Sequence, residues 1–70
     1  MSEDILRGRE IIIEYFTVGQ FVKVSAMDTK TLTEVTISGP VSAGEEMLRR
    51  NALKRLEYVL KKKGLISTGA

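Results

Sequence analysis

The stretch "EIIIEYFTVGQFVKVSAMD", residues 10–28, contains two runs rich in β-branched and aromatic residues, separated by a glycine. Such residues favour strands, and glycine readily adopts the positive φ that a tight hairpin requires. We therefore predict a first strand at about residues 10–17, a turn at Gly19 and a second strand at about residues 21–28.

We predict a hairpin register in which Phe16 pairs with Phe21 across a four-residue loop. This pairing places Glu14 opposite Lys23, and opposite charges on facing strands stabilise a sheet. Side chains alternate along a strand, so one face collects an apolar set. Its members are Ile11, Ile13, Tyr15, Val22, Val24, Ala26, Val35 and Ile37.

A third strand is predicted from "LTEVTIS", residues 32–38, which alternates apolar and polar residues. The preceding "DTKT" begins with Asp28, a residue favoured at the first position of a type I turn. Gly39 and Pro40 end the strand, because proline cannot donate to a hydrogen-bonded ladder. We expect a three-stranded antiparallel β-meander over residues 10–39.

Residues 42–63 are predicted to form a single long helix. Ser42 and Glu45 fit the capping-box pattern at its start, and lysines at its end complement the helix dipole. After the helix, Gly64 suits the left-handed position of a C-terminal cap, and Leu65 can fold back on the last turn. Apolar residues recur with helical spacing along one side. They are Leu48, Ala52, Leu53, Leu56, Val59 and Leu60.

Together these elements predict an α+β fold, in which a three-stranded antiparallel β-meander is followed by one long C-terminal helix packed on one sheet face. Residues 1–70 then form a single domain. We expect residues 1–9 to be flexible and residues 65–70 to form a short tail.

A chain of 70 residues has a small core and usually needs a disulfide, a metal or self-association for stability. This sequence has neither cysteine nor histidine, which removes disulfides and the usual zinc ligands. We therefore expect a homodimer without metal or cofactor. The longest unbroken apolar run, residues 11–13, is too short to span a membrane, and the N-terminus lacks a signal-peptide pattern, so we expect a cytoplasmic protein.

Positive charge is concentrated in the predicted helix. Residues 42–70 carry seven Lys and Arg against three Asp and Glu, whereas residues 1–41 carry four against six. One side of the helix could bind a polyanion such as RNA or DNA in a salt-dependent way, through Arg50, Lys54, Tyr58 and Lys61. The alternative is a solvated face. We favour it because Glu46 and Glu57 each stand four residues before one of these basic residues.

The second sheet face also carries apolar residues, which a single helix leaves uncovered. They are Ile12, Phe16, Phe21 and Met27. One interpretation is a self-association face that meets a second copy across a two-fold axis. Another is a platform on which the two phenylalanines stack nucleic-acid bases. We favour self-association because both phenylalanines adjoin one turn rather than lying on central strands. A third interpretation is an accessory subunit whose partner protein occupies this face.

The sequence gives little basis for catalysis, and we expect no enzyme activity. It has no histidine or cysteine, and its acidic residues fall mostly on turns, termini and solvated faces. General acid-base catalysis needs carboxylates in contrasting environments, typically within a cleft. "SGPVSAGEE", residues 38–46, places glycines before a helix but lacks the Gly-Lys-Ser/Thr ending of a P-loop. The predicted class is a small structural or interaction protein.

The hairpin and the break after the third strand resemble those of short bacterial, alphaproteobacterial proteins of unknown function with a βββα order. The residues that carry this resemblance are Val18, Gly19, Val22, Lys23, Val24, Ala26, Asp28, Gly39 and Pro40. The resemblance implies a fold and no activity.

The order of three strands and a helix containing "RRNALKRLEYVL", residues 49–60, is also similar to the second part of a double-stranded RNA-binding domain. That family has a basic cluster on the first turn of its last helix, where this sequence has "GEEM", residues 44–47. It also begins with a helix that the first nine residues here cannot match. No functional residue is carried over from it.

Overall fold

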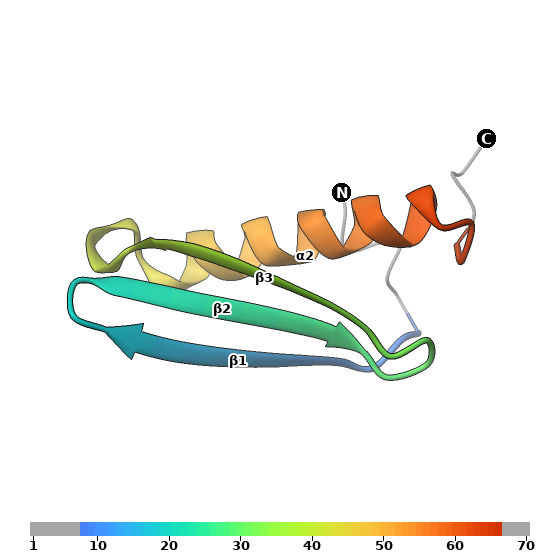
Figure 1. Cartoon of the computed structure of the whole chain (residues 1–70), viewed down its shortest axis with the longest axis horizontal. Helices are drawn as coiled ribbons and strands as arrows, with labels where there is room; N and C mark the ends of the chain where they lie inside the picture. The colour runs from blue at the N-terminus through green and yellow to red at the C-terminus, as the bar shows by residue number, and fades with distance from the viewer. Residues whose placement is uncertain (1–7, 67–70) are drawn as a thin grey trace.

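The computed structural model describes residues 8–66 of the chain. This part contains three strands, a short 3₁₀ helix and one long helix (Figure 1). They are β1 (Ile11–Val18), β2 (Phe21–Asp28), β3 (Thr33–Pro40), η1 (Val41–Ala43) and α2 (Glu45–Lys62). The antiparallel sheet has the order β1-β2-β3, and α2 packs on one of its faces. The predicted α+β fold, a β-meander with a C-terminal helix on one face, is confirmed.

The first hairpin turns through Gly19 and Gln20 alone. Val18 pairs with Phe21, so the predicted pairing of Phe16 with Phe21 is wrong by two residues. Gly19 has φ 60°, and two-residue hairpin turns favour such positive φ because their twist matches that of the strands. The tighter turn also adds a strand pair that a four-residue loop would forgo. A shift of two residues leaves every side chain on its predicted face.

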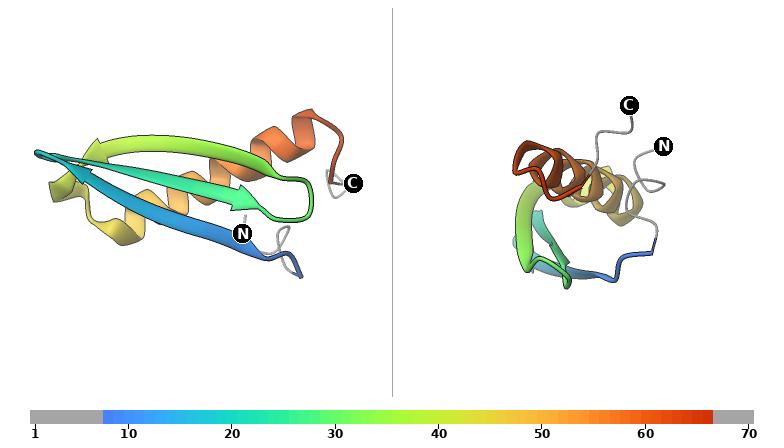
Figure 2. Two further views of the ribbon diagram at one scale, coloured as in Figure 1. Left: turned by 60° about the horizontal axis from the view of Figure 1, so that its bottom comes forward. Right: turned by 90° about the vertical axis from the view of Figure 1, so that its right-hand side faces the viewer.

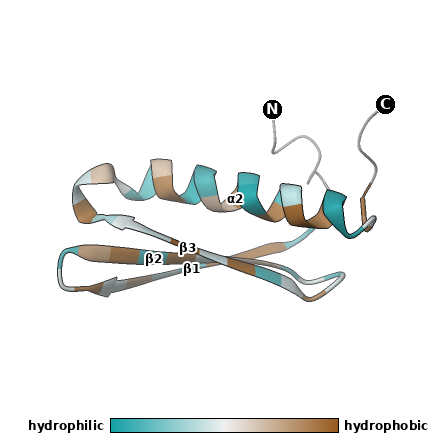
Figure 3. Ribbon diagram, turned by 45° about the horizontal axis from the view of Figure 1, so that its top comes forward, coloured by the Kyte–Doolittle hydropathy of each residue, from teal (hydrophilic) through white to brown (hydrophobic). Residues whose placement is uncertain are grey.

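The core lies between α2 and the side of the sheet that faces it. Val24, Ala26, Leu56 and Leu60 are fully buried there. Figure 3 shows hydrophobic and hydrophilic residues alternating along α2, as expected of an amphipathic helix. Tyr15 is on the same sheet face but is 39% exposed. The reason is that α2 packs mainly on β3 and β2, which leaves β1 at the margin of the core (Figure 2).

The helix begins later than the sequence predicts. Ser42 lies in η1, and the residue that precedes α2 is Gly44, with φ 88° and no side-chain cap. The predicted capping box of Ser42 and Glu45 is therefore wrong. Glycine adopts positive φ at little cost, so the chain turns at Gly44 and the helix starts at Glu45.

The end of α2 follows the prediction. Gly64 has φ 74°, and its amide donates to the carbonyl of Lys61 at 3.0 Å. The amide of Leu65 donates to the carbonyl of Leu60 at 2.8 Å. These two bonds satisfy carbonyls of the last turn in the manner of a Schellman cap.

β3 and α2 approach each other closely at Gly39. A Cβ atom at this position would lie 2.6 Å from Cδ2 of Leu48, whose residue is only 4% exposed. Carbon atoms attract best at about 3.5–4.0 Å, so a contact this short is repulsive. Glycine at position 39 therefore allows the first turn of the helix to settle on the end of the strand.

Candidate functional site

The open face, the side of the sheet turned away from α2, presents the residues predicted for self-association. Phe16 is 71% exposed, Phe21 60% and Ile12 40%, while Met27 is half-buried. Val18 shares this face and is 61% exposed. The sequence prediction missed Val18, although it continues the alternation of Ile12 and Phe16. These five residues together are called the open-face patch.

Charged residues lie beside the open-face patch. Glu14, Lys23 and Glu34 contribute to the lining of a shallow hollow on this face. The predicted pairing of Glu14 with Lys23 is wrong, since the two-residue shift puts Ser25 opposite Glu14 and Phe16 opposite Lys23. Within residues 8–66, none of these three charged side chains forms an ion pair. Their charges are available to a partner.

Apolar exposure on the sheet increases from β3 towards β1. On the open face β3 presents only polar side chains before Pro40, namely Glu34, Thr36 and Ser38. β1 instead contributes three of the five residues of the open-face patch, and Tyr15 is exposed on its other side. The surface best suited to an apolar contact is therefore the part of the sheet nearest β1.

The predicted polyanion stripe lies on the outer side of α2. Its residues are Arg50, Lys54, Tyr58 and Lys61, of which the first three are exposed. Glu46 lies 3.7 Å from Arg50, and Glu57 lies 3.1 Å from Lys61. These are the i,i+4 ion pairs predicted by the interpretation of a solvated face. Two of the three basic residues of the stripe thus have a carboxylate beside them.

The ring of Tyr58 is also in contact with neighbouring cations. The guanidinium carbon of Arg55 lies 5.6 Å from the ring centroid, and Nζ of Lys62 lies 5.8 Å from it. These distances fit cation–π interactions. A nucleic-acid base could stack on Tyr58 only by competing with these two side chains.

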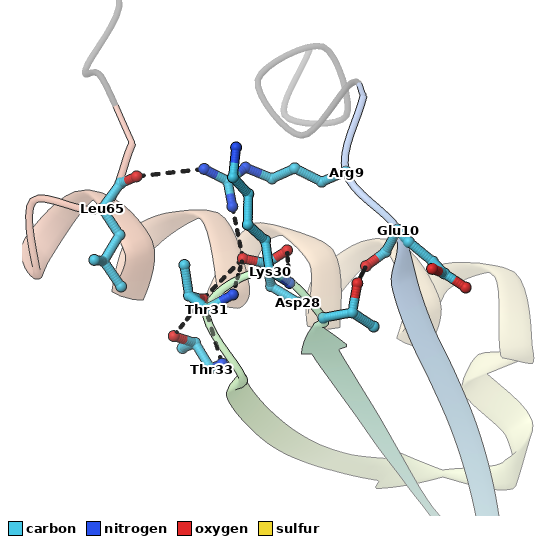
Figure 4. A network of polar contacts seen from close by, with 8 residues as sticks. Arg9, Glu10, Asp28, Lys30, Thr31, Thr33 and Leu65 are labelled. Atoms are coloured by element: carbon cyan, nitrogen blue, oxygen red, sulfur yellow. Dashed lines mark hydrogen bonds and ion pairs between the residues drawn. The ribbon is translucent and has the colours of Figure 1, made fainter.

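A polar cluster joins the start of β1, the end of β2 and the end of α2 (Figure 4). Arg9 donates to the carboxylate of Asp28 at 2.6 Å and to the carbonyl of Leu65 at 3.3 Å. The hydroxyl of Thr31 donates to the same carboxylate at 2.8 Å. Burial by itself would raise the pKa of Asp28. The Thr31 hydroxyl, the amide of Lys30 and the charge of Arg9 outweigh burial and hold that pKa below its usual value.

This cluster anchors a part of the chain that the sequence assigns to a flexible segment. Arg9 falls within the predicted flexible residues 1–9, yet its side chain is held at two points. Residues 1–7 and residues 67–70 of the predicted tail lie outside the described residues. The carboxylate of Asp28 is committed to interactions within the fold, which indicates a structural role.

Among residues 8–66, no three His, Cys, Asp or Glu side chains gather where they could hold a metal ion. The same part of the chain has no helix that combines the length and the hydropathy needed to cross a membrane.

Comparison with known proteins identifies a family. A model described as a domain of unknown function (DUF6898) matches residues 8–63. No curated protein and no solved structure matches the chain. The matched range includes all three strands, α2 and the open-face patch. It agrees with the predicted resemblance to short proteins of unknown function and lends no support to the resemblance to double-stranded RNA-binding domains.

Proposed function

This chain belongs to the DUF6898 family of domains of unknown function, and we propose that it is a small non-catalytic interaction protein that acts as a homodimer. The observation that carries the proposal is the open-face patch, in which Phe16 and Phe21 are 71% and 60% exposed. Full burial of a large apolar side chain is worth about 1.5–3 kcal/mol. Covering this patch would therefore add substantially to the stability of a small domain.

A second copy is the proposed occupant because the open face carries charges of both signs. Lys23 lies on the central strand, and Glu14 and Glu34 lie on the two outer strands. A two-fold axis brings the same surface of each copy together, and a surface with charges of both signs repels its own copy less than a surface of one sign would. Apolar residues and unpaired charges of both signs together make the face self-complementary.

The first test is the molecular mass in solution, measured by sedimentation equilibrium over a wide concentration range. We expect a dimer. Phe16→Asp should raise the dissociation constant at least about tenfold, equivalent to about 1.4 kcal/mol, because it places a charge within the contact. Thr36→Asp is the matched control, since Thr36 is exposed on the polar part of the same face.

Two results would contradict a homodimer formed through the open-face patch. One is a monomer at every concentration, which would favour an accessory subunit whose partner protein covers the open-face patch. The other is a dimer that Phe16→Asp and Thr36→Asp weaken equally, which would place the contact outside the patch. Circular dichroism of each variant separates a lost contact from a lost fold.

A second candidate function is weak, salt-dependent binding of RNA or DNA by the outer side of α2. The supporting observation is Lys54, which is exposed and has no ion-pair partner within residues 8–66. It stands between Arg50 and Tyr58 along the predicted stripe. A cation free of local carboxylates can release counterions from a phosphate backbone.

An amide-shift titration with short RNA and DNA at low and moderate salt tests this candidate. Binding should move the signals of Arg50, Lys54 and Tyr58, and Lys54→Glu should abolish the shifts. Lys30→Glu is the control, because it makes the same charge change in the turn between β2 and β3. Lys61→Glu is unsuitable because it would set two carboxylates together beside Glu57. Shifts that do not weaken with salt would contradict the proposal.

A further inference from the structure

We propose that the two copies pair along β1, so that their sheets join into one six-stranded antiparallel sheet. The inference rests on the proposed homodimer and places its contact at the β1 edge of the open-face patch, to which Ile12, Phe16 and Val18 belong. β1 is an edge strand, since β2 pairs with it on one side and no strand of the described chain lies on the other. It is also the strand that α2 covers least (Figure 2). A second β1 would complete its hydrogen bonding.

The hydrogen-bond ladder shows which groups of β1 face outward. The amide of Thr29 donates to the carbonyl of Glu10 at 3.2 Å, which continues the β1–β2 pairing and makes this pair a hydrogen-bonded one. Hydrogen-bonded pairs alternate along an antiparallel ladder, so the even-numbered residues of β1 bond to β2. The main-chain groups that point away from β2 belong to Ile11, Ile13, Tyr15 and Thr17. None of these groups has a partner within residues 8–66.

The composition of β1 is that of an interior strand. "IIIEYFTV" carries apolar residues on both faces, whereas a strand at a solvent-facing edge is usually marked by charged residues or proline. "TEVTISGP" of β3 is the opposite, with polar residues on the open face and a proline that cannot donate at the end of the strand. The sheet therefore has one edge suited to solvent, at β3, and one suited to a partner, at β1.

β1 also lacks the features by which edge strands usually avoid association. Natural edges are protected by lysine, proline, bulges or short length. β1 has eight residues, no lysine and no proline, and it pairs one-to-one with β2 without a bulge. Its single charged side chain is Glu14. That residue limits which register two copies can adopt.

The position of Glu14 favours a two-fold axis at Tyr15. An axis at Glu14 would set the two glutamates directly opposite each other, and like charges facing across strands are destabilising. An axis at Ile13 would pair only residues 11–15 within the strand. An axis at Tyr15 pairs all of residues 12–18 and places the two Tyr15 rings side by side.

This register also links the open faces of the two copies. The two-fold axis of an antiparallel pair is perpendicular to the sheet, so both α2 helices lie on one side and both open-face patches on the other. Ile12 of one copy then lies opposite the partner's Val18, as an apolar cross-strand pair. The β1 residues of the two patches thus cover one another in part across the axis, whereas Phe21 and Met27, on β2, stay outside this contact.

Amide hydrogen exchange of the dimer, followed by NMR, tests the pairing. Within β1, the amides of Ile12 and Glu14 bond to β2 and should be protected in any folded state. The amides of Ile13, Tyr15 and Thr17 should be protected only in the dimer, with exchange at least about tenfold slower than in dilute monomer. Fast exchange of these three amides in a protein shown to be dimeric would overturn the inference and leave the homodimer intact.

A pair of variants gives a second readout. Tyr15→Lys places two positive charges opposite each other at the axis. It should raise the dissociation constant of the dimer at least about tenfold. Continued protection of Ile12 and Glu14 would show that the variant is folded. Thr36→Lys is the control, because Thr36 is exposed on β3, far from the β1 edge. It should leave the dimer unchanged.

The variants also separate this inference from the proposed function. If Phe21→Ser dissociates the dimer and Tyr15→Lys does not, the two copies pack open face on open face. That result would overturn only the β1 pairing. A monomer at every concentration would overturn both. Sensitivity to Tyr15→Lys and to Phe16→Asp, whose new carboxylate would lie opposite the partner's Glu14, together with protection of the outward amides, is the result we expect.

Discussion

Arg9 and Asp28 form an ion pair of 2.6 Å between residues 19 positions apart in the chain. The carboxylate is fully buried and the arginine side chain is 14% exposed. Removing one partner of a buried pair leaves the other without compensation and typically costs about 3–5 kcal/mol. Because Arg9 can partly turn towards water, Asp28→Ala should lower the free energy of unfolding by about 2–4 kcal/mol.

Urea unfolding measures this loss. Glu34→Ala is the control, since Glu34 is an exposed carboxylate outside every ion pair within residues 8–66, and it should change the free energy of unfolding by less than about 0.5 kcal/mol. Equal effects of the two substitutions would show that the cluster of Figure 4 contributes nothing specific.

The same cluster predicts how stability depends on pH. The pKa of Asp28 is lowered in the folded protein, so the native state binds this proton more weakly than the unfolded chain, whose carboxyl pKa is about 3.9. The stabilisation is therefore complete above about pH 5, begins to fall near the pKa of the unfolded carboxyl, and is lost as the pH falls through the lowered pKa. Asp28→Asn should flatten the dependence in this acidic range. Unfolding curves from about pH 6 to about pH 2 provide the measurement, and an unchanged slope would contradict the prediction.

Gly39 and Leu48 should be coupled energetically. Gly39→Ala forces a Cβ into a contact of 2.6 Å with Leu48, and overpacking costs about 1–3 kcal/mol. The lower entropy of the unfolded chain offsets about 0.4–1 kcal/mol of this cost, which leaves a net loss of about 1 kcal/mol. Leu48→Ala alone should cost about 2–4 kcal/mol. The loss of stability in the double variant should be smaller than the sum of the losses in the two single variants. A double-mutant cycle that shows strict additivity would contradict the close approach.

Leu32 holds a backbone conformation that suits glycine. Its φ is 61°, and its side chain is 72% exposed, so little packing offsets the strain. The left-handed conformation costs roughly 1–2 kcal/mol for residues with a Cβ, while glycine loses about 0.5–1 kcal/mol through backbone entropy. Leu32→Gly should therefore raise the free energy of unfolding by about 0.5–1 kcal/mol. Leu32→Ala keeps the Cβ and should not raise the free energy of unfolding. Thermal unfolding of the wild type and the two variants measures the difference.

The order of elements and the facing sides of sheet and helix could be predicted because both depend on local periodicity. Strands repeat every two residues and helices every 3.6, so the pattern alone separates inner from outer side chains. Gly64 likewise marked the end of α2 because left-handed caps prefer glycine. Four of the five residues of the open-face patch were found by the same alternation, and Val18 was missed.

The hairpin register could not be recovered from that pattern. Any even slip preserves the faces, so pairing Phe16 with Phe21 is as consistent with the apolar pattern as the observed pairing of Val18 with Phe21. The start of α2 was missed because Gly44 competes with Ser42 for the turn before the helix. The link between Arg9 and Asp28 joins distant parts of the chain, and no local motif signals it.

The uneven placement of α2 also predicts that the fold does not open as a single unit. β2, β3 and α2 share the buried core, whereas β1 is attached through one ladder and a few contacts at its margin. Sub-global opening should begin with β1, at a lower free energy than the separation of helix from sheet. The turn at Gly19 tethers one end of that strand, and Arg9 adjoins the other. Arg9 therefore holds this end of β1 to the rest of the fold, and its replacement should lower the free energy at which β1 separates from β2.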